Sequence, residues 1–295
     1  MNITHDFFSY SPEIVDEQRS ADGTVKLLLE FQDGERIESV IMPFHRRYTI
    51  CLSTQAGCAM GCVFCRTGIQ GFNRNLTAEE IVTQYLTCYQ YIIDLEQKKN
   101  IAKPNIVFMG EGEPLHNFDN VKRACSILLS PDGVCLGPRQ ITLSTVGYLP
   151  GLKRFSEMPP INFALSLHSA IPEKRAMLIP LEKKYSLDTI LIQINKIPLM
   201  KNQYINFEYL LIADFNDSAE DADALSQLAG KYRCIVNIIP YNFVPELSFK
   251  SPDESGISSF KKLLVERSIR TMVRISKGRD IQAACGQLKG AIKCL

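Results

Sequence analysis

Short apolar runs alternate with longer amphipathic stretches along the chain, and the two patterns predict strands and helices respectively. Two opening runs at 25–31 and 36–42 flank the turn sequence Asp33-Gly34, which predicts a β-hairpin. From residue 47 onward six strand–helix units follow one another, and Thr77 and Glu80 have the spacing of a helix capping box. The strands are predicted at 47–54, 105–109, 140–144, 161–167, 204–212, 234–239 and 269–275, and the helices at 77–95, 117–129, 149–155, 187–197, 218–232 and 255–267.

This alternation predicts the fold class. Strand–helix units in series form parallel sheets with right-handed crossovers. The chain has no Pro/Gly/Ser-rich linker that would divide it, so we expect one curved or closed α/β barrel rather than two separate domains. In such barrels the chemistry lies on loops at the carboxyl ends of the strands.

Composition narrows the class of protein. Of the 295 residues 45% are hydrophobic and 22% are charged, as in globular proteins, and 33 Lys and Arg balance 32 Asp and Glu. This balance excludes a polybasic tail and an acidic solvating segment, but it leaves room for a local basic face that binds nucleic acid. The sequence has neither a ~20-residue apolar stretch nor a secretory signal. We therefore expect a cytoplasmic protein without membrane contact.

The ten cysteines carry the strongest chemical signal. In a reducing compartment, clustered cysteines bind metals or take part in catalysis. Cys58, Cys62 and Cys65 lie in the stretch GCAMGCVFC, after the first strand of the series. Three thiolates on one loop can hold three irons of a 4Fe-4S cluster and leave the fourth iron open to chelate S-adenosylmethionine. A zinc site or buried core cysteines are the alternatives, but zinc prefers four ligands and no second paired arm follows.

The C-x3-C-x2-C spacing after the first barrel strand resembles the signature of the radical S-adenosylmethionine enzymes. Several other stretches are specific to a smaller group, and they resemble the RlmN/Cfr family of RNA adenine methyltransferases. They run in the family's order from about residue 36 to residue 290. These stretches are CLSTQAGCAMGCVFCRTGIQGFNRNLTAEEI, VFMGEGEPLHN, ITLSTVG, LSLH, IIPYN and AACGQLKG.

The resemblance implies a partial (βα)6 TIM-like barrel of the radical S-adenosylmethionine type with a small N-terminal β extension. It divides the chain into a hairpin extension at 1–45, a barrel core at 46–276 and a C-terminal segment at 277–295. It implies a short member that lacks the N-terminal accessory domain with which full-length members help to hold RNA. The implied cofactors are a 4Fe-4S cluster and S-adenosylmethionine. The implied partners are ribosomal RNA, transfer RNA or both, and a reductant such as flavodoxin or ferredoxin, and we expect a monomer.

The resemblance also assigns a set of residues to the cofactors. Cys58, Cys62 and Cys65 would hold the cluster. Taken singly, the polar residues at the ends of strands are more often turn or helix-cap residues, and the case for them rests on their sharing one barrel mouth. The residues that would contact S-adenosylmethionine are Gly112, Glu113, Ser144, Ser166, Leu167, His168 and Asn242.

Three further residues match the catalytic positions of the family. Cys285 would accept a methyl group as S-methylcysteine, and Cys51 would form a disulfide with it to release the product. Without the resemblance, both would be interpreted as small buried apolar residues. Glu38 matches the proton acceptor, although an exposed strand glutamate is the alternative. Glu111 departs from the family, which more usually has Met at this position.

The reaction implied is methylation of adenosine at carbon 2, with 23S ribosomal RNA and/or transfer RNA as the substrate. Methylation at carbon 8, as in the Cfr branch, and a non-catalytic RNA-binding relative are the alternatives. Basic residues near the expected mouth could bind phosphates, although solvated charged faces explain them equally well. They are His45, Arg46 and Arg47, then Arg66 and Arg74, and then Arg270, Arg274, Lys277 and Arg279.

Overall fold

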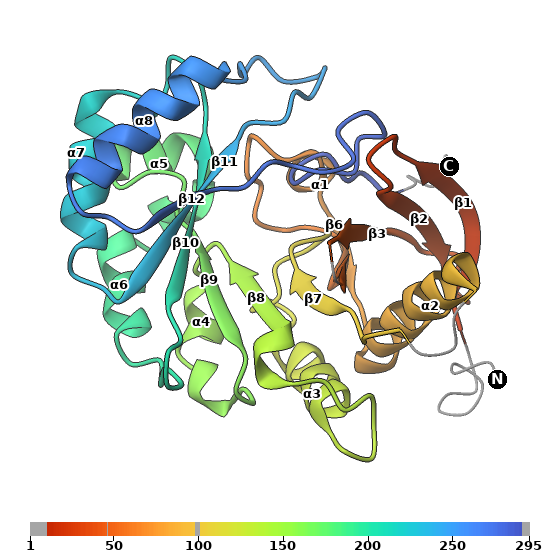
Figure 1. Ribbon diagram of the computed structural model, residues 1–295. Helices are drawn as coiled ribbons and strands as arrows, with labels where there is room; N and C mark the ends of the chain where they lie inside the picture. Colours follow the sequence, from red (N-terminus) through yellow and green to blue (C-terminus); the bar gives the residue numbers. More distant parts are fainter. Residues whose placement is uncertain (1–10, 46, 98–100, 291–295) are drawn as a thin grey trace.

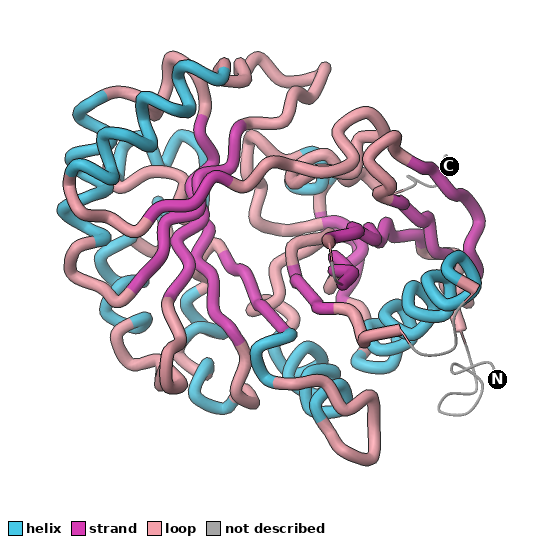
Figure 2. Tube along the Cα trace, in the orientation of Figure 1, coloured by secondary structure: helices cyan, strands magenta, loops and turns pink. Residues whose placement is uncertain are grey.

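One curved sheet runs through most of the protein. The computed structural model describes residues 11–45, 47–97 and 101–290. Neighbours along the strand series below are hydrogen-bonded to one another. The longer helices lie on the outer side of the wall that the strands form (Figures 1 and 2). The ten strands are β1 (Glu13–Arg19), β2 (Val25–Glu30), β3 (Arg36–Phe44), β4 (Arg47–Cys51), β7 (Asn105–Phe108), β8 (Ile141–Thr145), β9 (Asn162–Ser166), β10 (Ile205–Leu211), β11 (Cys234–Pro240) and β12 (Thr271–Val273).

In this sheet, β4 and the six strands from β7 to β12 are all parallel, and a helix lies in every crossover between them. The six predicted strand–helix units are therefore present, and the predicted partial α/β barrel is confirmed. The helices of these crossovers are α2 (Ala78–Glu96), α3 (Phe118–Leu129), α4 (Leu149–Leu152), α5 (Pro172–Leu178), α6 (Leu187–Ile194), α7 (Ala219–Ala229) and α8 (Glu254–Glu266), with 3-10 turns at Pro138–Gln140, Phe155–Glu157 and Pro180–Lys183.

The first four strands form an antiparallel extension of this sheet. The register of β3 against β4 pairs Val40 with Cys51. Directly opposed residues of an antiparallel pair share one face, and so do residues two apart along a strand. Glu38 therefore projects from the same face of the sheet as Val40 and Cys51.

The core lies between the sheet and the inner faces of the helices. Its large side chains include Tyr85 of α2, Phe108 of β7 and Phe207 of β10, all at most 1% exposed. In the described part of the chain, no helix is both long and apolar enough to cross a bilayer.

The structure differs from the predicted elements where the sequence pattern is weak. β1 was not expected, because all seven of its residues are exposed and show no alternation of apolar positions. β4 ends at Cys51 rather than at residue 54, since the chain turns into β5 (Gln55–Gly57), which pairs with β6 (Phe72–Asn75) in a separate small sheet. The short helices α1 (Arg66–Gln70) and α5 were also not expected, and the helix predicted at 149–155 ends at Leu152 before a 3-10 turn.

After β12 the chain crosses the molecule toward the β1–β2 hairpin (Figure 1). Two aspartates fasten this segment to the hairpin. Asp280 accepts hydrogen bonds from the Ser20 hydroxyl at 2.6 Å and from the Ala21 amide at 3.2 Å. Asp22 accepts one from the Gly278 amide at 3.1 Å. The segment thereby places the motif at 283–290 against the barrel.

Candidate active site

The three cysteines of the C-x3-C-x2-C motif lie on the loop between β5 and α1. Cys58, Cys62 and Cys65 all line one cavity of about 140 Å3 at the carboxyl end of the parallel strands. Gly57 begins the loop at φ +72°, and a Cβ there would lie 2.0 Å from the Gly71 carbonyl oxygen. Because only glycine tolerates that approach, the loop can close tightly on itself.

The donor chemistry of these cysteines fits a cluster. Thiolates are the ligands of iron–sulfur clusters, and three thiols share one cavity wall. Burial raises the pKa of Cys58 to about 12 and that of Cys62 well above its usual range, so binding of a metal group there would displace protons. Within the described residues, no three His, Cys, Asp or Glu side chains are arranged to hold a metal ion. The fit therefore rests on the thiol donors and their common cavity.

The loop after β7 carries the sequence GEGEP and borders the same cavity. Gly112 has φ +100°, and a Cβ on it would lie 2.6 Å from the Cβ of Gln55, so any side chain there would clash. Glu113 lines the cavity but is only 3% exposed. Its carboxylate accepts hydrogen bonds from the amides of Leu115 at 2.9 Å and Val146 at 3.0 Å. Burial raises the pKa of Glu113 to about 7.

Glu111 has a structural position outside the lining of the cavity. Its Oε1 accepts a hydrogen bond from the Glu38 amide at 2.8 Å, and its Oε2 is buried without a partner among the described residues. Burial, followed by the charge of Glu38, raises the pKa of Glu111 to about 8. The unusual carboxyl therefore joins the GEGEP loop to β3.

The next two strands supply polar groups from the opposite wall. Ser144 of β8 and Ser166 of β9 both line the cavity, and their hydroxyls are 3.2 Å apart. His168 also lines it, with Phe64 packed edge-on at 4.8 Å. The Leu210 amide donates to Nδ1 of His168 at 3.0 Å. Burial, with the nearby charge of Arg175, lowers the pKa of His168 to about 3, so the ring is neutral with its proton on Nε2.

Two predicted cofactor residues lie elsewhere. Leu167 is fully buried in the core and is not among the lining residues of the cavity. Asn242 follows β11, and its Nδ2 donates to the Cys285 carbonyl at 3.1 Å. Asn242 therefore holds the C-terminal segment in place beside the cavity.

Cys285 connects this cavity to a second one. The second cavity has a volume of about 320 Å3 and extends along the inner face of the sheet. Cys285 lines both cavities, and Cys51 lines the second. Both thiols are free. Cys285 is exposed and Cys51 is buried. Burial, followed by the charge of Cys285, raises the pKa of Cys51 well above its usual range.

Glu38 shares a sheet face with Cys51 but lies outside the lining of either cavity. Its carboxylate is 2.9 Å from Nζ of Lys26 and accepts a hydrogen bond from the Lys289 amide at 2.8 Å. Only 8% of the residue is exposed, so it is not the solvated strand residue that was the alternative. The C-terminal segment is thus bound to β3 through the predicted proton acceptor itself.

Two residues that the sequence analysis did not single out also contribute to the site. Glu208 of β10 lines both cavities, and its charge inside an otherwise apolar strand was the signal that could have revealed it. Arg175 of α5 is fully buried. Its guanidinium donates to the carbonyl oxygens of Leu167 at 3.1 Å and Val146 at 2.7 Å and is paired with Glu182.

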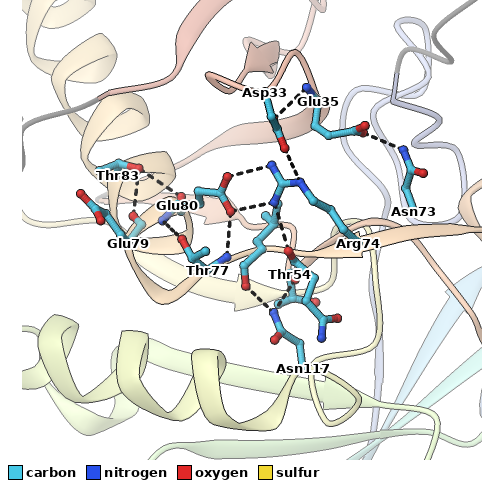
Figure 3. Close-up of polar contacts among 12 residues, drawn as sticks. Asp33, Glu35, Thr54, Asn73, Arg74, Thr77, Glu79, Glu80, Thr83 and Asn117 are labelled. Carbon is cyan, nitrogen blue, oxygen red and sulfur yellow. Dashed lines mark hydrogen bonds and ion pairs between the residues drawn. The ribbon is translucent and has the colours of Figure 1, made fainter.

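The predicted basic residues divide into bound and accessible groups. Arg74 bridges Asp33 and Glu80, as Figure 3 shows, and the same Glu80 forms the predicted capping box with Thr77. Arg74 is therefore not available to bind phosphate. Arg66 donates to Glu246 at 2.9 Å.

Three other basic residues contact an aromatic ring or line the second cavity. Arg270 is stacked on the Tyr204 ring, with 4.7 Å from its guanidinium carbon to the ring centroid. Arg274 and Lys277 line the second cavity. Arg46 lies outside the described residues.

Known proteins share this arrangement. No protein-family model matches the chain. The chain is 44% identical over 278 residues to the dual-specificity RNA methyltransferase RlmN 2 of Myxococcus xanthus (strain DK1622), which covers 92% of this chain and 72% of that protein. It is also 44% identical over 283 residues to the dual-specificity RNA methyltransferase RlmN of Syntrophotalea carbinolica, which covers 96% of this chain and 73% of that protein.

A solved structure agrees with the sequence comparison. The crystal structure of a radical SAM methyltransferase from Sphaerobacter thermophilus matches with a TM-score of 0.88 at 36% identity, over 96% of this chain and 83% of that one. Membership of such a family implies S-adenosylmethionine and a 4Fe-4S cluster. The chain is therefore an enzyme and belongs to the RlmN family of radical S-adenosylmethionine methyltransferases, as its motifs predicted.

Proposed function

We propose that the protein methylates carbon 2 of an adenosine in ribosomal RNA, transfer RNA or both, through an S-methylcysteine on Cys285. The observation that carries the proposal is the position of Cys285, which borders both the cavity of the three cysteines and the cavity that contains Cys51. A group carried on this sulfur could be loaded from one side and delivered to the other. The names of the relatives, dual-specificity RNA methyltransferases, support an RNA substrate.

The cofactors would be held by side chains of the first cavity. Cys58, Cys62 and Cys65 would hold the cluster, while Gly112, Ser144 and His168 would line the space for S-adenosylmethionine. When bound, the two groups supply the methyl group and the radical chemistry that activates it. Glu113 holds the turns after β7 and β8 together through its two amide partners, so we assign it a positioning role.

The chain's own residues would then carry out the transfer. The Cys285 thiol loses its proton and takes the methyl group. After the carbon is joined to the adenine ring, Glu38 accepts the proton that leaves the ring. The Cys51 thiolate then attacks the sulfur of Cys285 and forms a disulfide with it. The electron pair of the broken S–C bond stays with the product carbon, which takes up a proton and becomes the methyl group, and an external reductant restores both thiols. The cavity that Cys51 and Cys285 share, and the face of the sheet that Glu38 shares with Cys51, support these three roles.

The target base must leave its stack to reach Cys285. Enzymes that modify a base extrude it from a duplex or act on single strands, and RNA loops offer unstacked bases at lowest cost. We therefore expect an adenosine in a loop rather than in a helix.

Nucleoside mass spectrometry tests the proposal. Reconstituted protein would be incubated anaerobically with S-adenosylmethionine, a reductant, and total RNA from cells that lack RlmN-type enzymes. We expect 2-methyladenosine with the wild type and none with Cys285→Ala, whose iron content should be unchanged. Cys135→Ser replaces an exposed free cysteine away from both cavities and should leave the activity intact. Appearance of 8-methyladenosine would show that the methylated position is carbon 8 and not carbon 2. Full activity of Cys285→Ala would contradict the cysteine mechanism.

A further inference from the structure

Glu208 occupies the boundary between the two cavities. Four residues line both of them, namely Met109, Glu208, Ile239 and Cys285. Met109 and Ile239 are apolar, and Cys285 is the proposed methyl carrier. Glu208 is therefore the one carboxyl group in this shared wall of the described structure, and any base that reaches Cys285 from the second cavity passes beside it.

One oxygen of Glu208 is fixed and the other is available. Oε1 accepts a hydrogen bond from Nδ2 of Asn237 at 2.9 Å, and Oδ1 of Asn237 in turn accepts one from Nε of Arg274 at 3.2 Å. This chain of bonds sets the orientation of the carboxyl group. Oε2 has no hydrogen-bond partner among the described residues, and it is not one of the fully buried atoms. Because the side chain lines both cavities, this oxygen opens onto them.

The second cavity has the chemistry of a nucleotide site. Met42, Val107 and Ile275 give it apolar walls, as flat bases require. Three cations, Arg139, Arg274 and Lys277, also line it, and cations of this kind hold phosphates. Glu208 is the only acidic residue in its described lining. Neutral polar residues such as Asn105, Gln140 and Asn206 also line the cavity. An ionised carboxyl group can only accept hydrogen bonds, so Glu208 suits an N–H donor on a base.

We propose that Oε2 of Glu208 accepts a hydrogen bond from the exocyclic amino group of the adenine that is to be methylated, which makes Glu208 a specificity-determining residue. This inference rests on the proposed function and adds to it the group that recognises the base. Adenine has a donor at this position, whereas guanine and hypoxanthine have an oxygen acceptor there. An oxygen facing Oε2 would be repelled and would leave a buried acceptor unsatisfied.

S-adenosylmethionine also contains adenine, but the geometry favours the RNA base. The residues assigned to the cofactor, such as Gly112, Ser144 and His168, line the first cavity alone. Glu208 also lines the second and larger cavity, together with Cys51 and the cations. The distinction can be tested directly, because only the RNA base can be varied without changing the cofactor.

The experiment tests variants of Glu208 on RNA oligonucleotides that differ in the exocyclic group of the target base. Oligonucleotides would copy the site that the wild-type enzyme methylates, with adenine, purine or hypoxanthine at the target position. We expect the wild type to prefer adenine to purine by about 10- to 100-fold in kcat/KM, the range for a hydrogen bond to a charged group. Glu208→Ala should reduce this preference to a few fold. Glu208→Gln, which can present its amide N–H₂ to an oxygen, should raise the hypoxanthine-to-adenine ratio at least tenfold.

The outcomes separate the inference from the proposed function. Glu266→Gln alters an exposed glutamate of α8 and should keep all wild-type ratios. Equal loss of rate on all three oligonucleotides would place Glu208 on the cofactor or in the scaffold and would overturn the inference while leaving the proposed function intact. Wild-type protein that methylates no RNA would overturn both. If Glu208→Ala does not fold, the isosteric Glu208→Gln decides alone through its base ratios.

Discussion

Glu111 shows how a single buried carboxyl makes stability depend on pH. Its pKa is raised from 4.5 to about 8, first by burial. The folded state therefore binds a proton that the unfolded state has lost between these two values, so the free energy of unfolding should fall as the pH rises through this window. At about 1.4 kcal/mol per pKa unit, the window is worth on the order of 3–5 kcal/mol.

Glu111→Met should remove this dependence. We expect the stability of the variant relative to wild type to rise from pH 5 to about pH 8 and then to level off, although it loses the bond to the Glu38 amide. Urea unfolding at several pH values would measure it. Glu79→Met changes an exposed glutamate of α2 and provides the control, whose stability difference from wild type should not vary with pH. If the stability difference between Glu111→Met and wild type were equally independent of pH, the Glu111 carboxyl would not be desolvated.

At the scale of elements, Arg175 joins α5 to the ends of two barrel strands. Its guanidinium contacts carbonyl oxygens that follow β8 and β9, and it neutralises the buried Glu182. Arg175→Met should therefore leave an unpaired buried carboxylate, at a cost of about 3–5 kcal/mol. Arg175→Lys keeps the charge but not the fork of donors, and we expect an intermediate loss. Chemical denaturation would measure the stability of the wild type and both variants. Equal stability of all three proteins would contradict the stabilising role of Arg175.

The elements also show what the sequence could reveal. The parallel strands and long helices were predictable because their apolar positions recur with the period of the element. β1 has the sequence EIVDEQR with every residue exposed. Its place depends on hydrogen bonds to β2 and on the contact of Arg19 with the Tyr91 ring. α5 is short and begins at Pro172, and it is held by the long-range contacts of Arg175. Neither set of contacts leaves a local pattern.

The candidate site was predictable to a different degree. Short-range motifs located the cysteines and the loops at strand ends, which the structure gathers around one cavity. The resemblance alone singled out Cys51, Cys285 and Glu38. Glu208 was overlooked because one charged residue in a strand has no local meaning, and its importance arises only when β10 and the C-terminal segment meet.

At the scale of the whole molecule, the C-terminal segment joins distant parts of the chain around the site. It contacts the β1–β2 hairpin through Asp22 and Asp280. It contacts α1, directly after the cysteine loop, through the bond from the Thr67 hydroxyl to the Leu288 carbonyl at 2.7 Å. Because Cys285 lies within this segment, the hairpin should control the position of the methyl carrier even though it is remote in sequence.

The double variant Asp22→Ala/Asp280→Ala tests this connection. It should exchange the amide hydrogens of 277–290 faster, because the segment loses its bonds to the hairpin, while the parallel strands keep their protection. Methyl transfer should fall by about tenfold, since small misplacements of a reacting group are costly. Asp132→Ala, an exposed aspartate far from the segment, should change neither quantity.

The connection should also depend on pH. Hydrogen bonds lower the pKa of Asp22 to about 2 despite its partial burial. The contribution of Asp22 to stability is therefore present above the unfolded pKa of about 4 and is lost as the pH falls toward 2. Faster exchange without loss of transfer would show that Asn242 and the cysteine loop position Cys285 unaided.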